Sequence, residues 1–523
     1  MKTKSNIDYA LMLPSVILTL ALSVPLAIFR DEGAEIVSKV FAFTTSNFKW
    51  AFMLFGLFCV VFLIGLSLSK WGNIKLGQPE DKPEFSTYSW AAMIFCAGIG
   101  IAIVYWAFIE PVYYMGGPPL GILPGSDLSA EWAGMLGQFH WGITPWAIYA
   151  IPTIPIAYAI HVKKASTLRL STACKGVIGS HAEGLLGKVI NMLVVFAMIG
   201  GVGTSLGLAV PLVTALIANI FGMQESFQLQ LIVLAIFTGV ISVTVYAGLQ
   251  KGIAKLADFN TYVAYFLLIF IFVVGPTIFI LNLWVNSLGL MVNDFIRMSL
   301  WTDPISQSGF PEGWTVFYWA WWIAYAPMMG LFVARISRGR TIRQVILGEL
   351  VFGSLGCWIF FAIWGGYAID VQISGALDVA SIVAEVGTPG TIIAILSSLP
   401  AGNWLIIPVF TILCIVFLAT TLNSAAFTLS AQVTKEIRGD EEPNKWNRTL
   451  WAIFLGIFAV GLLATGGLQA VQLASVVVAL PLMPILITML FSLRKWLKED
   501  YGQMLSSKVI VLDSAQINSI DKD

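Results

Sequence analysis

Twelve stretches of this chain are apolar over about 20 residues, the length that an α-helix needs to cross a membrane. Because lipid cannot satisfy exposed backbone groups, such stretches fold as helices. The chain of 523 residues is 58% hydrophobic and 11% charged, with a mean hydropathy of +0.84, which is outside the composition of soluble proteins. We therefore predict an all-α polytopic membrane protein with spans at 9–29, 50–69, 88–108, 140–161, 190–219, 229–247, 259–282, 314–334, 346–370, 403–432, 447–466 and 471–493.

The basic residues fix the expected orientation. Of the 29 Lys and Arg, only Arg30, Lys39, Lys49 and Arg297 fall in the odd-numbered loops. Cytoplasmic loops carry an excess of Lys and Arg, so both termini are predicted to lie in the cytoplasm. This distribution predicts an even number of spans in a multi-pass protein of the cytoplasmic (inner) membrane. The net charge of zero says nothing about nucleic acid, and no basic patch suggests a nucleic-acid partner.

Two predicted spans contain residues that interrupt helices. The third holds Gly98, Gly100 and Ala102 in alternation, and the eighth holds Pro327 and Gly330. The two spans are five apart, so each opens a block of five. Interrupted helices at corresponding positions of two repeats indicate a transporter binding site, because unwound backbone frees carbonyls and amides for ligands. Between the blocks, residues 288–301 predict a short amphipathic helix at the interface, too short to span.

The eighth span carries a concentrated aromatic face. Seven of the twelve residues from Trp314 to Tyr325 are aromatic. On a helix, one face of about 100° collects six side chains: Trp314, Tyr318, Trp321, Trp322, Tyr325 and Met329. Aromatic faces of this kind hold quaternary ammonium groups. An interfacial aromatic belt or core packing is the alternative, but a belt lies at span ends, whereas Trp321, Trp322 and Tyr325 lie mid-span.

A few polar residues lie in or beside the spans. Thr420 and Thr421 could supply oxygens to a monovalent cation, although each hydroxyl could instead bond to its own helix. Asp258 is expected to cap the seventh span, with Asn260 following it. Glu110, in a Pro/Gly-rich turn, is expected to be solvated. The scattered histidines and cysteines predict no metal site, and no phosphate loop or nucleophile motif suggests an enzyme or an ATP-driven pump.

At these residues the chain resembles the betaine-choline-carnitine transporter family. The most specific match is 310–340, FPEGWTVFYWAWWIAYAPMMGLFVARISRGR, with further matches at 139–149, 203–212 and 248–252. The resemblance implies homotrimers of twelve-span subunits in lipid, with a LeuT-type five-plus-five inverted repeat and no cofactor. We accordingly divide the chain into a tail with two peripheral spans (1–87), a first repeat (88–282), an interfacial helix and loop (283–313), a second repeat (314–493) and a short cytoplasmic tail (494–523).

The resemblance also implies a substrate site for a zwitterion that bears a quaternary ammonium or sulfonium group. Its central cage falls on six residues of spans 4 and 8: Trp141, Trp146, Tyr149, Trp321, Trp322 and Tyr325. Tyr113 and Trp314 match substrate positions of carnitine exchangers, and so does the tyrosine, rather than tryptophan, at position 325. The third-span motif lacks the third glycine of sodium-coupled betaine carriers, at Ala102, and lacks the Asp of choline carriers.

The residues at the ion position divide between two subgroups. Asn260 stands where sodium-independent exchangers have Arg, and the paired hydroxyls resemble sodium-coupled members. The implied ion position is completed by Cys96, Ile99, Phe417, Thr420 and Thr421. Met329 instead matches a thioether that replaces sodium in exchangers. We favour sodium symport, with sodium-independent exchange of carnitine against γ-butyrobetaine as the alternative.

Two other classes of function are weighed against transport. A non-transporting sensor would keep the cage and lose the interrupted helices or ion oxygens, and a channel would need a continuous polar pore. The sequence does not separate carnitine, glycine betaine, crotonobetaine and dimethylsulfoniopropionate, which share a cationic head. The tail at 496–523 is short and lacks a basic run, so osmotic gating is not expected.

Overall fold

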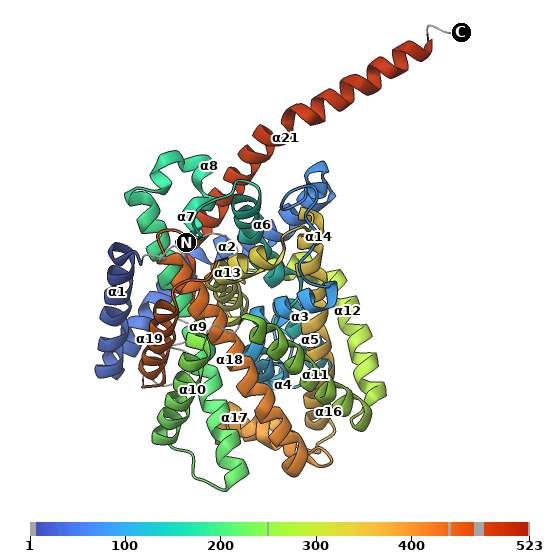
Figure 1. Cartoon of the computed structure of the whole chain (residues 1–523). Helices are drawn as coiled ribbons and strands as arrows, with labels where there is room; N and C mark the ends of the chain where they lie inside the picture. The colour runs from blue at the N-terminus through green and yellow to red at the C-terminus, as the bar shows by residue number, and fades with distance from the viewer. Residues whose placement is uncertain (1–6, 248–249, 438–440, 465–474, 521–523) are drawn as a thin grey trace.

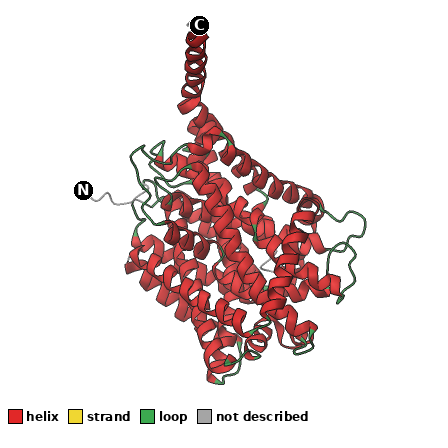
Figure 2. Cartoon of the chain, turned by 90° about the vertical axis from the view of Figure 1, so that its right-hand side faces the viewer, coloured by secondary structure: helices red, strands yellow, loops and turns green. Residues whose placement is uncertain are grey.

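The structure, a computed structural model, describes residues 7–247, 250–437, 441–464 and 475–520. In these ranges the chain is helical, and its β pairing is limited to two isolated bridges, Ile7 with Thr434 and Lys75 with Thr341. The helices pack into one body, from which the end of α21 projects (Figures 1 and 2). The predicted all-α class is therefore confirmed.

The helices follow one another along the chain with short connections. The first half contains α1 (Tyr9–Ile28), α2 (Arg30–Leu68), η1 (Lys70–Asn73), α3 (Thr87–Gly98), α4 (Gly100–Gly116), α5 (Asp127–Trp141), α6 (Ile143–His161), α7 (Leu170–Ala173), α8 (Lys175–Ile178), η2 (Gly179–Ala182), α9 (Leu185–Phe221), α10 (Phe227–Ala247) and α11 (Gln250–Val274). The second half contains α12 (Thr277–Leu300), η3 (Pro311–Val316), α13 (Phe317–Ile336), α14 (Ile342–Leu347), η4 (Gly348–Gly353), α15 (Ser354–Phe360), η5 (Phe361–Gly365), α16 (Gly366–Ile373), α17 (Val379–Ser397), η6 (Gly402–Ile406), α18 (Ile407–Gln432), α19 (Lys445–Ala464) and α21 (Leu482–Ile520). The elements η3 to η6 are π-helical turns that continue into α-helices.

In the described ranges, nine helices are long and apolar enough to cross a membrane, and α3 with α4 makes a bent tenth candidate. Three shorter apolar helices lie at Tyr9–Ala21, Phe227–Val243 and Asp258–Val274. The count of twelve spans stays a prediction, because α12 is also long enough to cross.

The expected end of the seventh span and the expected length of the interfacial helix are wrong. The seventh span, expected over 259–282, ends at Val274, because Gly275 and Pro276 interrupt the helix. Residues 277–282 belong instead to α12, which has 24 residues and is longer than the short interfacial helix expected at 288–301. The expected tail from residue 494 is helical as far as Ile520 and continues α21, and its place in the cytoplasm stays a prediction.

Several contacts between central helices occur twice: a contact between two spans of one repeat pair has a counterpart between the spans that lie five positions away in the chain. Helix α3 packs on α18, and α13, which forms most of the eighth span, packs on α9, which forms the fifth. In the same way α6 packs on α13, and η4 in the ninth span packs on α3. This correspondence is expected of two five-helix repeats with one architecture, and it places α3, α6, α13 and α18 together at the centre.

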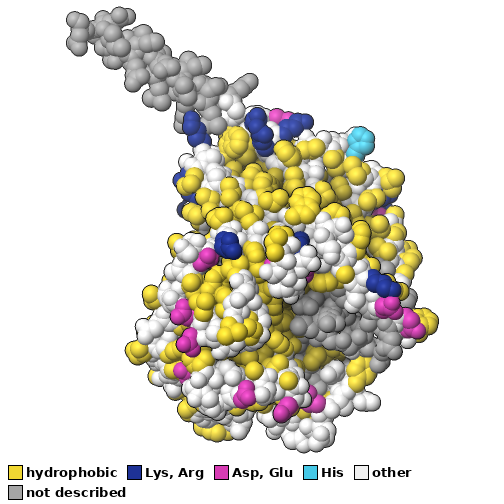
Figure 3. All heavy atoms as spheres, turned by 180° about the vertical axis from the view of Figure 1, so that it is seen from behind, with side chains coloured by type: hydrophobic (Ala, Val, Ile, Leu, Met, Phe, Trp, Pro, Cys, Tyr) yellow, Lys and Arg dark blue, Asp and Glu magenta, His cyan; other side chains and the backbone are white. Residues whose placement is uncertain are grey.

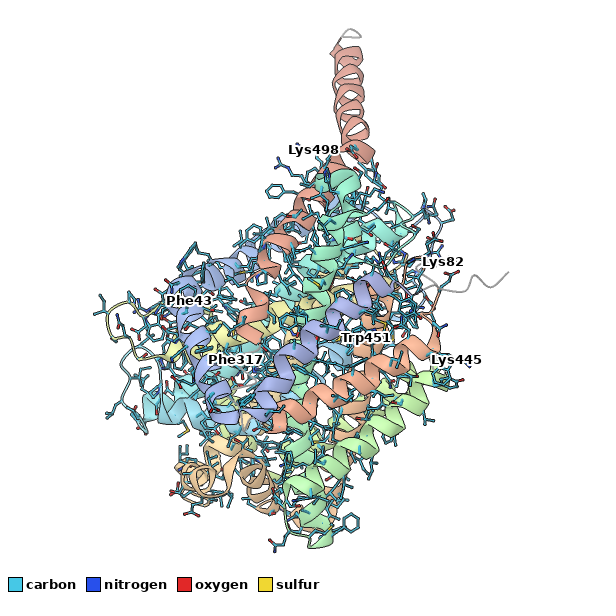
Figure 4. All side chains as sticks on the ribbon, turned by 90° about the vertical axis from the view of Figure 1, so that its left-hand side faces the viewer. Phe43, Lys82, Phe317, Lys445, Trp451 and Lys498 are labelled. Carbon is cyan, nitrogen blue, oxygen red and sulfur yellow. The ribbon has the colours of Figure 1, made fainter. Side chains whose placement is uncertain are left out.

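The surface and the interior differ as a membrane protein requires. Large apolar side chains cover the sides of the body, and in the view of Figure 3 basic side chains lie mostly toward the end from which α21 leaves. Acidic side chains lie mostly toward the opposite end in the same view. In Figure 4 the aromatic rings of Phe317 and Trp451 lie inside the body, whereas Lys82, Lys445 and Lys498 lie at its edge.

The segment ARISRGR at the end of α13 connects the second half of the chain to the first half through contacts outside the spans. The backbone N–H of Leu76 donates to the carbonyl of Arg340 at 2.8 Å, and Arg338 donates twice to Asp81 at 3.0 Å. The Arg338 guanidinium holds the pKa of Asp81 below its ordinary value. Arg340 also lies over the ring of Trp90, 4.1 Å from its centroid. These family-signature residues therefore join α13 to the start of α3.

Candidate functional site

The third span is interrupted where the glycines predicted it. Helix α3 ends at Gly98, and α4 begins at Gly100 after a bend of 69° at Ile99. Gly100 has a φ of +44°, in the left-handed region that side chains with a Cβ rarely adopt. Ala102 lies in the first turn of α4, and its N–H donates to the carbonyl of Ile99 at 3.1 Å. The predicted interruption is therefore confirmed, with Ile99 at its centre.

The expected interruption of the eighth span at Pro327 and Gly330 is wrong, because α13 runs through both residues without a break. A proline removes one backbone donor, and a buried helix held by its neighbours can tolerate that loss. Gly330 has a packing role instead. A Cβ on it would lie 2.8 Å from Cγ of Pro152, so this glycine lets α13 approach α6 closely.

Gly330→Val should destabilise the protein, because the added methyl groups would overlap Pro152 on α6. Overpacking of this kind costs about 1–3 kcal/mol. The midpoint of thermal unfolding in detergent should fall. Gly239→Val is the matched control, since a Cβ at Gly239 in α10 meets nothing within 4 Å. An equal loss in both variants would show that valine itself, rather than the contact between α6 and α13, causes the effect.

The fourth predicted span is also interrupted, which the sequence did not indicate. Helix α5 ends at Trp141, Gly142 has a non-helical φ of −95° and ψ of −128°, and α6 begins at Ile143. A Cβ on Gly142 would lie 2.5 Å from both the carbonyl oxygen of Gln138 and Nε1 of Trp358. This break separates Trp141 from Trp146 and Tyr149, so two helices present the span's aromatic rings.

The six cage residues lie together where α5, α6 and α13 meet. Trp321 and Trp322 stack with centroids 5.1 Å apart and an interplanar angle of 8°. Trp141 meets Trp322 edge to face at 4.9 Å, and Tyr149 does the same at 5.9 Å. The other ring contacts of the cage are Trp146 with Tyr149 at 5.6 Å, Trp141 with Trp321 at 6.2 Å and Tyr149 with Tyr325 at 6.4 Å. All six side chains are at most 5% exposed, and their rings contact one another, so a bulky cation would have to part them.

Hydrogen bonds to backbone carbonyls hold several of these rings by their edges. Trp322 donates from Nε1 to the carbonyl of His140 at 3.1 Å, and Trp321 donates to Gly201 at 3.3 Å. The hydroxyl of Tyr149 donates to the carbonyl of Gly98 at 3.2 Å, which links the cage to the end of α3. Trp146 lies against the same glycine, because a Cβ there would be 3.0 Å from its Cη2. The polar edges of Trp321, Trp322 and Tyr149 are thus engaged, and their faces remain for packing.

Tyr113 and Trp314 lie in a second aromatic cluster beside the cage. Their ring centroids are 6.0 Å apart, and Trp314 stacks on Tyr318 at 6.2 Å. Tyr318 in turn stacks on Trp322 at 5.7 Å, so the cluster is continuous with the cage. The hydroxyl of Tyr113 forms a hydrogen bond of 2.9 Å with Thr388 on α17, a helix that the sequence analysis missed.

Glu110 is not the solvated carboxylate that its Pro/Gly-rich surroundings predicted. It lies inside α4, which continues through Pro111 to Gly116, and its side chain has no exposed surface. It accepts hydrogen bonds from Tyr114, from Trp141 at 2.9 Å and from Tyr318 at 2.6 Å. A buried intramembrane carboxylate bonded to a cage residue belongs to the site. The sequence did contain one signal of this burial. Glu110 lies only eight residues after Ala102, so the helix of the third span can extend through it.

The predicted ion residues gather around the break after Gly98. A Cβ on Gly100 would lie 2.7 Å from Oγ1 of Thr421 and 3.9 Å from Cδ1 of Phe417, so α18 faces the break directly. Thr420 donates from its hydroxyl to the carbonyl of Phe417 at 2.8 Å. On α13, Cε of Met329 would lie 2.9 Å from a Cβ on Gly98.

Helix α11 supplies the other predicted ion residues. It begins at Gln250 in the described structure, so Asp258 lies within the helix and the expected capping role is wrong. Asn260 is buried, and among the described residues neither its Oδ1 nor its Nδ2 has a hydrogen-bond partner. The next residue, Thr261, lies 3.6 Å from Sγ of Cys96 on α3. The structure thus places Thr261, the neighbour of Asn260, against α3 at the turn before the break.

Several known proteins are similar to this chain. The chain is 33% identical over 505 residues to a carnitine transporter of Acinetobacter baumannii, with 96% of this chain and 91% of that protein covered. It is 34% identical over 448 residues to the uncharacterized transporter YeaV of Escherichia coli, with 86% and 92% covered. A solved structure of a Na⁺-coupled sialic acid symporter, in a substrate-bound outward-open state, matches with a TM-score of 0.43 and 10% identity over 82% of this chain and 81% of that one. A family model described as "BCCT, betaine/carnitine/choline family transporter" matches residues 10–502, and the chain therefore belongs to this family.

Proposed function

We propose that this protein is a secondary transporter of a trimethylammonium zwitterion, carnitine or glycine betaine first, driven by sodium symport. One observation carries the proposal: a closed aromatic cage lies directly beside an interrupted helix. The hydroxyl of Tyr149 in the cage is bonded to the carbonyl of Gly98, at the end of α3. Substrate and ion would thus meet at one pair of helices, as coupled transport requires.

The chemistry of the cage favours a methylated cation as the recognised group. Such a cation cannot donate hydrogen bonds, and aromatic faces attract it electrostatically. The edges of Trp321, Trp322 and Tyr149 are already bonded to carbonyls, so their faces are the surfaces left to bind it. The relative named as a carnitine transporter covers nearly the whole chain, which supports a substrate of this class.

In alternating access, the cage would open first toward one side of the membrane and then toward the other. In this structure the six cage side chains are almost wholly buried, so neither side of the membrane has open access to them. The bend at Ile99 and the break at Gly142 place hinges next to the cage on α3–α4 and α5–α6. Movement at these hinges would part the rings and open the cage toward one side.

Sodium coupling is expected to depend on Thr421 more than on Thr420. The Thr421 hydroxyl faces Gly100 at the break, whereas the Thr420 hydroxyl is bonded to its own helix. Thr421→Val removes one oxygen with little change in shape, so it should raise the sodium concentration for half-maximal uptake severalfold. Proteoliposome uptake of radiolabelled carnitine and glycine betaine against sodium concentration measures this.

Thr428→Val is the matched control for that experiment, because the Thr428 hydroxyl on the same helix donates only to the carbonyl of Ser424 at 3.0 Å. Its sodium dependence should equal that of wild type. Sodium independence of wild type, with uptake that needs preloaded γ-butyrobetaine, would contradict the symport proposal.

Sodium-independent exchange is the second candidate. It is favoured by Met329, whose Cε would touch a Cβ on Gly98, so its thioether lies beside the break. Asn260, without a described partner, is the opposing observation, because exchange without sodium would need a fixed charge that this amide does not supply. Asn260→Arg should therefore shift uptake toward sodium independence.

The proposal extends to the oligomeric state of the protein and to its orientation in the membrane. We infer a homotrimer in the cytoplasmic membrane, with both termini in the cytoplasm. Positive residues gather toward the end from which α21 leaves, in line with the rule that basic residues stay inside (Figure 3). A non-transporting sensor is disfavoured because the interrupted helix and the polar residues around it are both present.

A further inference from the structure

We propose that Glu110 is a proton-binding site linked to the aromatic cage, so that a proton on Glu110 and a cation in the cage exclude each other. The proton would reach Glu110 through a relay formed by Tyr114, His140 and Thr315. The link to the cage rests on the proposed function, because it requires a cationic substrate there. The proton site itself rests on the following contacts alone.

The relay is a continuous chain of hydrogen bonds between buried side chains. Glu110 contacts the hydroxyl of Tyr114, and that hydroxyl lies 2.6 Å from Nδ1 of His140. Nε2 of His140 lies 3.0 Å from Oγ1 of Thr315 in η3. All four side chains are at most 1% exposed. The residues just before Thr315 in η3, 312–314, are partly exposed, so the relay leads from the carboxylate toward the surface.

The contacts accommodate Glu110 both with and without a proton. With a carboxylate, Tyr114 donates to Oε1, His140 donates from Nδ1 to the Tyr114 oxygen, and Thr315 donates to Nε2. When a proton enters at Nε2, the Nδ1 proton passes to Tyr114, and the Tyr114 proton passes to Glu110. The carboxyl then donates to Tyr114, which donates to Nδ1, and Nε2 donates to Thr315. Every relay atom keeps a partner in both states, and the net change is one proton on Glu110 and the other tautomer of His140.

The other carboxylate oxygen joins the relay to the cage. Oε2 of Glu110 accepts from Nε1 of Trp141 at 2.9 Å and from the hydroxyl of Tyr318 at 2.6 Å. Both rings contact Trp322, at centroid distances of 4.9 and 5.7 Å. A negative charge on Glu110 therefore lies one side chain away from the surface proposed to hold the cation, in a site that excludes water.

Among the residues that the structure describes, nearby ionisable groups do not provide a fixed positive partner for Glu110. His140 has its Nδ1 4.0 Å from Oε1, and the hydroxyl of Tyr114 contacts both groups. The charged residues on the helices packed against α4, together with those at η3, are each exposed or half-buried: Asp127 and Glu131 on α5, Lys188 on α9, Asp370 on α16, Glu385 on α17, and the pair of Glu312 with Lys49. A cation in the cage would thus compensate the Glu110 charge, and a proton would do so when the cage is empty. Binding of one should release the other, and this linkage is reciprocal.

The first test needs no substrate. Infrared difference spectra of the purified protein between about pH 8.5 and about pH 5 should show the carbonyl band of a protonated carboxyl. The band should be absent from Glu110→Gln and present in Glu349→Gln, which removes the other fully buried glutamate of the described spans. Loss of the band in Glu349→Gln with retention in Glu110→Gln would overturn the proposal.

The second test measures linkage to the cage. Dissociation constants for tetramethylammonium, glycine betaine and carnitine should rise by about tenfold on acidification of wild type, since nearby charges in a water-excluded site interact strongly. Glu110→Gln should bind weakly at both pH values, with no pH dependence, and Glu110→Asp should restore the dependence. Equal pH dependence in wild type and Glu110→Gln would overturn the proposed link. The infrared band without binding of any probe would support the proton site and contradict the proposed function.

Discussion

Gly100→Leu is expected to abolish substrate uptake. Gly100 begins α4 with a φ of +44°, a conformation in which a residue with a Cβ costs roughly 1–2 kcal/mol. Its absent Cβ would also lie 2.7 Å from the Thr421 hydroxyl, so any side chain would enter the space between α4 and α18 where the ion is proposed to bind. Both effects act at the hinge, and uptake in proteoliposomes measures their sum.

Gly116→Leu is the matched control, since it lies at the other end of α4 and a Cβ there meets nothing within 4 Å. The control should retain uptake. Gly100→Leu should still elute as wild type does on size-exclusion chromatography, and Gly100→Ala, with a smaller side chain, should show a partial loss. Normal uptake by Gly100→Leu would show that the glycine serves neither the hinge nor the ion position.

Those parts of the site that local residue patterns specify could be predicted from the sequence. Alternating glycines in an apolar span indicated the interruption at Ile99, because no packing partner is needed to make glycine flexible. The aromatic face of α13 followed from helical periodicity alone, and the structure brings its rings against Trp141 and Tyr149. The family resemblance identified the fourth span as the other part of the cage.

The features that the sequence did not predict depend on tertiary packing. Pro327 and Gly330 have the composition of a break, but close contact with α6 keeps α13 continuous. Gly142 interrupts the fourth span with a non-helical backbone, and Gln138 and Trp358 leave no room for a Cβ there, contacts that no local pattern reveals. Helix α17 has only 19 residues, and its apolar pattern is interrupted by Glu385 and by the Gly-Thr-Pro-Gly segment at 387–390.

The burial and the hydrogen-bond donors of Glu110 likewise could not be predicted from the sequence. From the sequence, a carboxylate next to Pro111 and a Gly-Gly-Pro-Pro segment belongs to a solvated turn. In the structure, donors from two other helices surround it, Trp141 at the end of α5 and Tyr318 on α13. These donors are 31 and 208 residues away in the chain, so no local pattern could reveal that they satisfy the buried charge.

The second large effect is expected from Trp322→Leu, which should weaken substrate binding by tenfold or more. The ring of Trp322 is contacted by four aromatic rings, Trp141, Tyr149, Tyr318 and Trp321, and three of these belong to the cage. A desolvated cation–π contact is worth about 2 kcal/mol, and each 1.4 kcal/mol is about tenfold in affinity. Tryptophan-fluorescence titration with glycine betaine and carnitine measures the change.

Two further variants separate the contribution of the ring face from other losses. Trp322→Phe and Trp322→Leu both lose the hydrogen bond of 3.1 Å to the carbonyl of His140, so any difference between them reports the aromatic face. Phenylalanine should therefore retain part of the affinity that leucine loses. Trp319→Leu removes an equally buried tryptophan of α13 that packs on Phe139, 5.5 Å away, and faces α2, so it should bind as wild type does. Equal affinities for Trp322→Leu and Trp319→Leu would contradict the assignment of Trp322 to the cage, because the loss of affinity would then reflect helix packing rather than recognition of the cation.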